Sequence, residues 1–258
     1  MKFIQTAFYT LIVLILIGSS VTSSPLSKIF SSEEPVITRH SNVIYPALLQ
    51  DNREASLQYV QQFSERKREY LIYTYKKGSK YFSKVNTILK KYHVPQEFKV
   101  LIALESGFTA NALSRAGAKG YWQFTDEAAV EYGLKTSKTD DRTNFVKSTN
   151  AAGHYLRDRL KELDNDALLV AASYNCGIGK VKDAMKKSGI ANADFWDIKK
   201  YLPAETRNYV MNFIALNVVF NNYDKFLDNN MLFSDVVIHL QPTAAQIEGV
   251  NSAVTLIN

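Results

Sequence analysis

The sequence predicts an all-α fold. The 258-residue chain contains only 11 Gly and 6 Pro, and 46% of its residues are hydrophobic while 22% are charged, a balance typical of a globular protein. Apolar side chains recur at helical spacing in several segments, whereas no run of alternating β-branched residues occurs before the C-terminal stretch. The length suits one sizeable helical domain with a small appendage.

Residues 1–24 are interpreted as a signal peptide. Lys2 is their only charged residue, an apolar run covers residues 7–17, and small residues follow as far as Ser24. We expect export to the periplasm or cell envelope, because the apolar run is shorter than the roughly 20 residues that a membrane span needs. An uncleaved N-terminal anchor is the alternative. Lipid attachment is not expected, because the only cysteine, Cys176, lies far from the apolar run.

A helical N-terminal extension is expected over residues 25–93. It begins with a Ser-rich linker at 25–35, and apolar side chains then recur at helical spacing in residues 54–75 and 81–92. Pro95 is expected to begin the next element. Both apolar stripes suit packing against the domain that follows.

The stretch from Phe98 to Phe124 contains the candidate catalytic residue. An apolar helical segment ends with a carboxylate, Glu105, and Gly107 is expected to end that helix. The next carboxylate is Asp126, so the stretch holds no second acid after Glu105. Its other residues are mainly small, hydroxylated, amide or aromatic, which are the types that hydrogen-bond sugar hydroxyls and stack on sugar rings. Glu105 is therefore expected where a core meets a cleft.

Three motifs in this chain resemble those of one enzyme family. The stretch from Glu105 to Gln123 follows the pattern E-S-x-F-x-x-x-A-x-S-x-x-G-A-x-G-x-x-Q. This pattern resembles the catalytic signature of the lytic transglycosylases of glycoside hydrolase family 23, in particular the membrane-bound murein transglycosylase D type. Residues 171–177 resemble the A-Y-N-x-G motif of that family, and residues 202–210 resemble its last motif. The resemblance extends over residues 94–223, about half of the chain.

The resemblance implies a lysozyme-like (goose-type) helical catalytic domain over residues 94–228, with residues 229–258 left as an unassigned C-terminal tail. It implies a carbon–oxygen lyase that cleaves the bond between N-acetylmuramic acid and N-acetylglucosamine in peptidoglycan and forms 1,6-anhydro ends. Glu105 would be the catalytic residue. The substrate-binding residues carried over from the motifs are Ser106, Ser114, Gln123, Tyr174, Asn175, Glu205 and Tyr209.

The implied mechanism needs one carboxyl group in two protonation states. Glu105 would first protonate the glycosidic oxygen and then, as a carboxylate, take the proton of the muramoyl C6 hydroxyl. The substrate's own acetamide oxygen would replace the second carboxylate that most glycosidases use. The first step requires a raised pKa for Glu105, which burial beside apolar and aromatic residues would produce. Ser114, Gln123 and Asn175 would orient the acetamide and sugar hydroxyls.

The remaining carboxylates near the motifs have local explanations. Thr125 can cap a helix whose first turn holds Asp126 and Glu127. The pair Asp140 and Asp141 is interpreted as loop and capping chemistry. With four His and no cluster at ligand spacing, the sequence predicts neither a catalytic metal nor another cofactor.

Four further helices are expected after these residues. One covers residues 148–163, and the next is the nearly all-apolar segment ALLVAASY, for which Asn165 or Asp166 can be the N-cap. Residues 179–187 form the third, and the last runs from Pro203 to about residue 220. Cys176 is interpreted as a small buried hydrophobe.

The partners expected are peptidoglycan glycan strands, with the protein as a monomer. The formal net charge of +6 suits peripheral association with anionic cell-wall polymers or membrane surfaces. The basic stretches at residues 66–68, 76–77 and 90–91 are interpreted as solvated helix faces, and no nucleic-acid motif accompanies them. Two alternatives remain. A lysozyme-type muramidase would need a second carboxylate to hold water, and a non-catalytic peptidoglycan-binding protein would be expected to lack Glu105.

Overall fold

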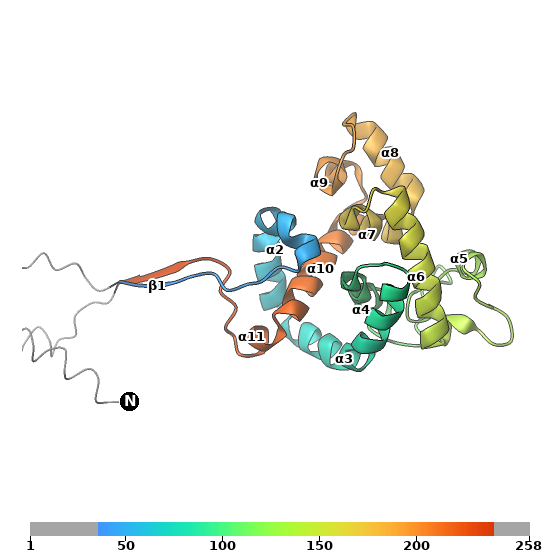
Figure 1. Cartoon of the computed structure of the whole chain (residues 1–258), viewed down its shortest axis with the longest axis horizontal. Helices are drawn as coiled ribbons and strands as arrows, with labels where there is room; N and C mark the ends of the chain where they lie inside the picture. The colour runs from blue at the N-terminus through green and yellow to red at the C-terminus, as the bar shows by residue number, and fades with distance from the viewer. Residues whose placement is uncertain (1–35, 240–258) are drawn as a thin grey trace, which may run out of the picture. The chain divides into compact units, whose positions relative to one another are not determined.

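The computed structural model describes residues 36–239, and the expected all-α fold is confirmed (Figure 1). Two compact units are distinguished. One contains two short strands, and the other is the helical unit His40–Asp235. The α-helices are α2 (Arg53–Arg66), α3 (Arg68–Lys91), α4 (Val100–Ser106), α5 (Asp126–Glu131), α6 (Phe145–Glu162), α7 (Ala167–Cys176), α8 (Ile178–Ser188), α9 (Phe195–Ile198), α10 (Ala204–Asn221) and α11 (Tyr223–Leu227). Short 3-10 helices are η3 (Ala47–Asn52), η4 (Gln96–Lys99), η5 (Asp141–Thr143) and η6 (Lys199–Tyr201).

The two strands form an antiparallel pair. Strand β1 (Val36–Arg39) pairs with β2 (Val236–His239), with Val36 opposite His239 and Arg39 opposite Val236. Four residues of weak alternation identify neither a strand nor its partner, so this part of the C-terminal tail has no assignment from the sequence. The predicted signal peptide and the whole of the predicted linker at residues 25–35 lie outside the described residues. The proposed division of the chain at residues 93/94 and 228/229 stays a prediction.

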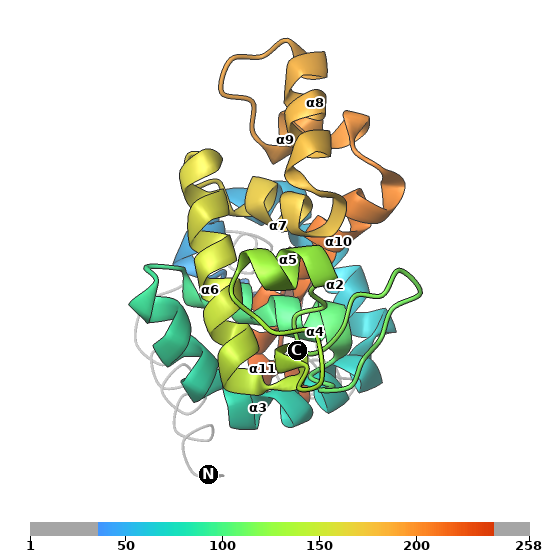
Figure 2. The same cartoon turned by 90° about the vertical axis from the view of Figure 1, so that its right-hand side faces the viewer.

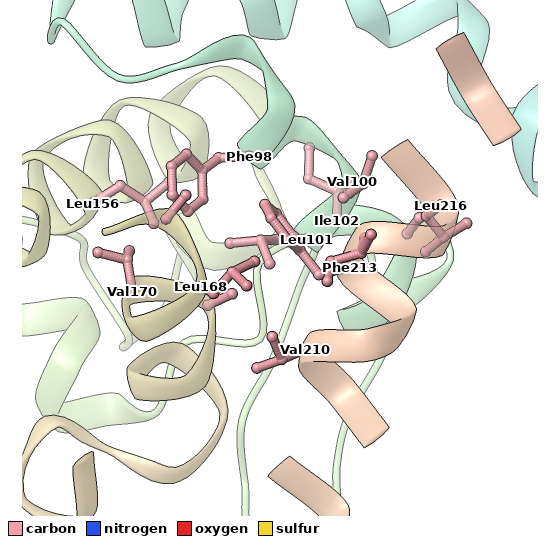
Figure 3. Close-up of a cluster of buried hydrophobic side chains, with 14 of the residues drawn as sticks. Phe98, Val100, Leu101, Ile102, Leu156, Leu168, Val170, Val210, Phe213 and Leu216 are labelled. Atoms are coloured by element: carbon pink, nitrogen blue, oxygen red, sulfur yellow. The ribbon is translucent and has the colours of Figure 1, made fainter. Parts of the chain in front are cut away.

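Helix α10 lies at the centre of the helical unit. It packs against α2, α4 and α7, and all its residues from 213 to 220 are buried (Figures 1 and 2). A helix that is apolar on nearly all sides is stable only when other elements surround it. Figure 3 shows Phe213 and Leu216 of α10 in one cluster with Leu101 and Ile102 of α4. Each such fully buried side chain contributes about 1.5–3 kcal/mol, which fixes α4 against α10.

The expected helix starts around the site are confirmed. Thr125 accepts a hydrogen bond from the backbone N–H of Ala128 at the start of α5. Asp166, rather than the alternative Asn165, caps α7, and its Oδ1 accepts from two backbone N–H groups at 2.8 and 2.9 Å. Asp140 caps η5, so the capping interpretation of the Asp pair is also confirmed. In α7, residues 167–173 are all buried.

The expected boundary between the two N-terminal helices is wrong. The predicted gap between residues 75 and 81 contains Gly78, which instead lies inside α3, and the chain turns at Lys67. A Cβ at Gly78 would lie 2.5 Å from the Phe108 ring, so the glycine serves close packing and does not interrupt the helix. The turn at Lys67 places the Arg68 guanidinium against two backbone carbonyls at the end of α11. These long-range contacts leave no local sequence signal.

Within residues 36–239, no helix combines the length and the apolar character that crossing a bilayer requires.

Candidate functional site

Glu105 lies in the last turn of a short, rigidly held helix. The residues of α4 from Val100 to Ala103 are buried, and Gly107 ends the helix in the left-handed conformation with φ = 53°, as expected from the sequence. Its N–H donates to the carbonyl of Ala103 at 3.1 Å. The Glu105 side chain is partly buried. The helix end therefore fixes the position of the carboxyl group while leaving part of it accessible.

Two partly buried tyrosines from other helices lie around this carboxyl group. The Tyr209 hydroxyl of α10 donates to Glu105 Oε1 at 2.6 Å, a short distance typical of a bond to a charged acceptor. The Tyr174 hydroxyl of α7 donates to the backbone carbonyl of Trp122 at 2.7 Å. Burial raises the pKa of both phenols well above its ordinary value, so both remain neutral donors. Helices α4, α7 and α10 thus meet at Glu105.

The electrostatics of the site favour a protonated Glu105. Burial raises the pKa of its carboxyl group from the ordinary 4.5 to about 7. The hydrogen bond from Tyr209 opposes this shift because it stabilises the carboxylate, and the negative charge of Glu205 adds to it. Desolvation is the largest of the three effects, so the group is close to half protonated at neutral pH. This is the state that a residue acting first as acid and then as base requires.

The loop between α4 and α5 has a backbone that only particular residues can adopt. Gly120 has φ = 84°, and a Cβ there would lie 2.0 Å from the backbone oxygen of Arg142. Lys119 forms isolated β-bridges to Leu113 and to Phe124, which fold the loop back on itself. A larger residue at position 120 would therefore displace the segment that faces η5.

A buried guanidinium group holds the same loop in place. Arg142 forms a two-pronged pair with Asp140, at 2.9 and 2.8 Å, and an ion pair with Asp126 at 2.5 Å. It also donates to the carbonyls of Gly117 and Phe124. This pairing holds the pKa of the Asp140 carboxyl well below its usual range. Arg142 is not among the residues that the sequence indicates for the site. The acidic pair directly before it was the only available signal.

Three of the predicted substrate-binding side chains make contacts within the loop. Ser106 donates to the carbonyl of Tyr121 at 2.8 Å. The Gln123 amide nitrogen donates to the carbonyls of Ala112 and Gly120 at 3.0 and 2.9 Å. Ser114 Oγ accepts from the N–H of Ala118 at 3.0 Å, and within residues 36–239 its own hydrogen has no acceptor.

The other predicted residues lie on α7 and α10. Asn175 Oδ1 accepts from the Thr206 hydroxyl at 2.8 Å, and among the described residues its amide nitrogen has no acceptor. Glu205 is exposed in the first turn of α10, close enough for its charge to raise the pKa of Glu105. The structure thus gathers Tyr174, Tyr209 and Glu205 around Glu105. No direct hydrogen bond joins Ser106, Ser114 or Gln123 to that carboxyl group in the described part of the chain.

Among the described residues, no group of three or more His, Cys, Asp and Glu side chains is arranged to hold a metal ion. Burial raises the pKa of the Cys176 thiol, which keeps it in the neutral, unreactive form.

Comparisons with known proteins agree with the resemblance of the motifs. Residues 83–196 match the family model of the transglycosylase SLT domain. The chain is 37% identical over 141 residues to membrane-bound lytic murein transglycosylase D of Escherichia coli (strain K12), covering 54% of this chain and 31% of that protein. It is 33% identical over 112 residues to peptidoglycan transglycosylase gp16 of Escherichia phage T7, covering 43% of this chain and 8% of the phage protein.

Among solved structures, the 70-kDa soluble lytic transglycosylase Slt70 of Escherichia coli is similar to this chain. The TM-score is 0.46 at 17% identity, covering 71% of this chain and 37% of that one. The chain spans about a third of the length of the transglycosylase D that it matches. Residues 83–196, which include Glu105 and its loop, carry the family match. Residues 83–196 therefore match the transglycosylase SLT domain family, and over this region the chain is similar to lytic murein transglycosylases.

Proposed function

We propose that the protein is a peptidoglycan lytic transglycosylase. It cleaves the glycosidic bond between N-acetylmuramic acid and N-acetylglucosamine and leaves a 1,6-anhydro-muramoyl end. The observation that supports this most directly is the environment of Glu105, a partly buried carboxyl group with a pKa of about 7 inside the SLT domain. A carboxyl group that gives and then takes a proton near neutral pH suits this two-step reaction.

In the first step, protonated Glu105 donates its proton to the glycosidic oxygen. The bond from that oxygen to the anomeric carbon breaks, and the substrate's acetamide oxygen bonds to the same carbon. The Tyr209 hydroxyl, 2.6 Å from Glu105 Oε1, stabilises the carboxylate that remains. In the second step, this carboxylate takes the C6 hydroxyl proton, and the C6 oxygen displaces the acetamide oxygen. The anhydro ring is closed without water.

The loop and α7 supply the groups that position the sugar. The Ser114 hydroxyl hydrogen and the Asn175 amide nitrogen are the donors left over after their contacts within the chain. They orient the acetamide and the neighbouring hydroxyls. Ser106 and Gln123 act mainly by holding the loop, since their donors bond to backbone carbonyls.

A lysozyme-type hydrolase is the second candidate, and Glu205 is the observation that favours it. The sequence directly after Glu105 contains no carboxylate as far as Asp126, which argues against a second acid from that stretch. Glu205 comes from α10 instead, and its negative charge is near enough to raise the pKa of Glu105. Asp126 is less suited to hold a water, because it is paired with Arg142. A hydrolase would use the Glu205 carboxylate to activate the attacking water.

Mass spectrometry of the products from purified sacculi tests the proposal. The wild-type protein should release muropeptides with anhydro ends, and Glu105→Gln should release none. Glu97→Gln, a neutralised glutamate in η4 outside the site, is the matched control and should keep its activity. Reducing ends would support the hydrolase, and an active Glu105→Gln protein would contradict the assignment of the acid.

Cellular placement is part of the same proposal. Export by residues 1–24 places the protein in the periplasm or cell envelope, where peptidoglycan is found. Residues 94–228 are proposed as the catalytic region and residues 25–93 as its N-terminal extension. The protein acts as a monomer in peripheral contact with the wall or the membrane.

A further inference from the structure

A pocket between α2 and α10 lies outside the segment that matches the SLT domain. Its volume is about 310 Å³, and its lining combines aromatic, amide and basic side chains, with no Asp or Glu: Tyr59, Gln62, Phe63, Arg66, Lys67, Asn208 and Asn212. Helices α2 and α10 lie side by side in both views (Figures 1 and 2). Neither the motifs nor the family match accounts for this composition.

The α10 wall of the pocket begins next to the candidate catalytic site. Asn208 and Asn212 are four residues apart and therefore lie on the same side of α10. Asn208 is the immediate neighbour of Tyr209, whose hydroxyl bonds to Glu105. At 1.5 Å per residue, Asn212 lies only about 4.5 Å along the helix axis from Tyr209. The pocket and Tyr209 therefore lie within one helical turn of each other along α10.

The α2 wall is held in a defined arrangement. The rings of Tyr59 and Phe63 are stacked, with centroids 5.9 Å apart and an interplanar angle of 18°. The Tyr59 hydroxyl donates to Asn212 Oδ1 at 2.6 Å, which leaves the amide nitrogen as a donor. Arg66 donates to Gln62 at 3.1 Å, so its side chain lies along the same face of α2. The pocket therefore offers hydrogen-bond donors at fixed places.

The positive charge of the pocket has no acidic partner in the described part of the chain. No ion pair involving Arg66 or Lys67 occurs among residues 36–239, and both side chains are exposed. The nearby Glu65 accepts instead from Gln61. From the sequence, this basic stretch is expected to be a solvated helix face. An arginine fork beside amides and aromatic rings is also the set that recognises a carboxylate on a saccharide or peptide.

We propose that this pocket binds a carboxylate of the substrate strand beyond the scissile bond. The inference rests on the proposed function for the identity of the strand. In peptidoglycan the carboxylate has two sources: the peptide stem, or the lactyl group of a muramic acid whose stem has been removed. Arg66 and Lys67 bind the carboxylate, and the amide nitrogens of Asn208 and Asn212 donate to its neighbouring oxygens.

Binding measurements on Glu105→Gln protein test the pocket without cleavage. Three ligands of equal length are compared by calorimetry: peptide-bearing glycan, glycan stripped by an amidase so that the lactyl carboxylate is free, and neutral chitooligosaccharide. The added pair Arg66→Gln and Lys67→Gln should weaken binding of a carboxylate ligand about tenfold and leave chitooligosaccharide binding unchanged. Weakening confined to the peptide-bearing glycan assigns the stem, and weakening confined to stripped glycan assigns the lactyl group.

The matched control removes an equal charge from the end of another helix. Lys90 and Lys91 are consecutive exposed cations at the C-terminal end of α3, where the helix dipole favours positive charge as it does at the end of α2. Lys90→Gln with Lys91→Gln should leave all three affinities unchanged. If both pairs of substitutions weakened ligand binding equally, the effect would be one of net charge alone, and the proposal would be overturned. The proposal would also be overturned if Arg66→Gln with Lys67→Gln left the affinities for the carboxylate ligands unchanged.

A second variant guards against an effect on folding. Asn208 is exposed, so Asn208→Trp can fill the pocket from the solvent side without disturbing the core. It should weaken carboxylate ligands at an unchanged melting temperature, and full affinity would contradict the proposal. Because these tests use inactive protein, their outcome is separate from that of the proposed function. Absence of anhydro products from the wild-type protein would reject the function alone.

Discussion

The hydrogen bond between Tyr209 and Glu105 makes the pH dependence of activity a sharp test of the site. Tyr209→Phe removes the donor that stabilises the Glu105 carboxylate, while the ring that helps to bury the carboxyl group remains. Because that bond lowers the pKa and burial raises it, loss of the bond should raise the pKa above about 7. Glu205→Gln removes a negative charge that raises the pKa, so it should shift the pKa in the opposite direction.

The size of each shift follows from the strength of the interaction that is lost. A hydrogen bond to a charged group contributes about 1.5–3 kcal/mol, and one pKa unit corresponds to about 1.4 kcal/mol. Water can partly replace the Tyr209 hydroxyl, so we expect an upward shift of about one unit. Glu205 is exposed, and solvent screens its charge, so Glu205→Gln should lower the pKa by only about a few tenths of a unit.

The assay is the profile of kcat/KM against pH for soluble glycan strands. Protonated Glu105 is needed for the first step, so the alkaline limb of this profile reports its pKa. The limb should lie near pH 7 for the wild type, higher for Tyr209→Phe and slightly lower for Glu205→Gln. Tyr73→Phe, a change at an exposed tyrosine of α3, is the control and should leave the profile unchanged. The reasoning would be refuted if the alkaline limb of the Tyr209→Phe profile stayed at the wild-type pH or moved to lower pH.

The other predictions concern stability and turnover. Burial raises the pKa of Glu105 from 4.5 to about 7, so the folded state binds more protons between these values and stability falls as pH rises through them. In urea titrations, Glu105→Gln should therefore raise the free energy of unfolding by about 1–3 kcal/mol near pH 8, and it should not raise it near pH 4. An unchanged free energy of unfolding near pH 8 would contradict the burial of the Glu105 carboxyl group. Gly120→Ala should lower the free energy of unfolding by at least about 2 kcal/mol, because φ is positive at this position and a backbone carbonyl oxygen lies 2.0 Å from the added methyl group. An unchanged free energy of unfolding would mean that the loop can shift freely. Gly78→Ala should lower the free energy of unfolding by about 1–3 kcal/mol through steric clash. Gly179→Ala, at a helical position with open space, should raise it by up to about 1 kcal/mol. Equal effects of the two substitutions in thermal unfolding would contradict the packing argument. Ser114→Ala should lower kcat about tenfold to a hundredfold with little change in glycan affinity, and a change in affinity alone would assign it a binding role.

Local sequence rules predicted the position of the acid and the helix starts around it. The apolar run before Glu105 and the glycine after it placed the carboxyl group at a helix end, as observed. Thr125, and either Asn165 or Asp166, are predicted as caps because capping depends on a side chain and backbone groups two or three residues away; the structure has Thr125 and Asp166. Such short-range patterns are readable from the sequence alone.

Long-range contacts were beyond these rules. Tyr209 was a cleft candidate only through the family pattern, and its hydrogen bond to Glu105 joins residues 104 positions apart. The Arg142 network and the close packing at Gly78 depend equally on which distant segments meet. The turn at Lys67 and the β1–β2 pair were missed for the same reason, since tertiary contacts override weak local preferences.

Cleavage in water labelled with heavy oxygen tests the central claim most directly. If Glu105 closes the anhydro ring with the C6 hydroxyl, the new muramoyl ends produced by the wild-type protein should carry no label, and Glu105→Gln should produce no new ends. Labelled reducing ends would contradict the transglycosylase account and assign the second step to a water molecule held by a carboxylate.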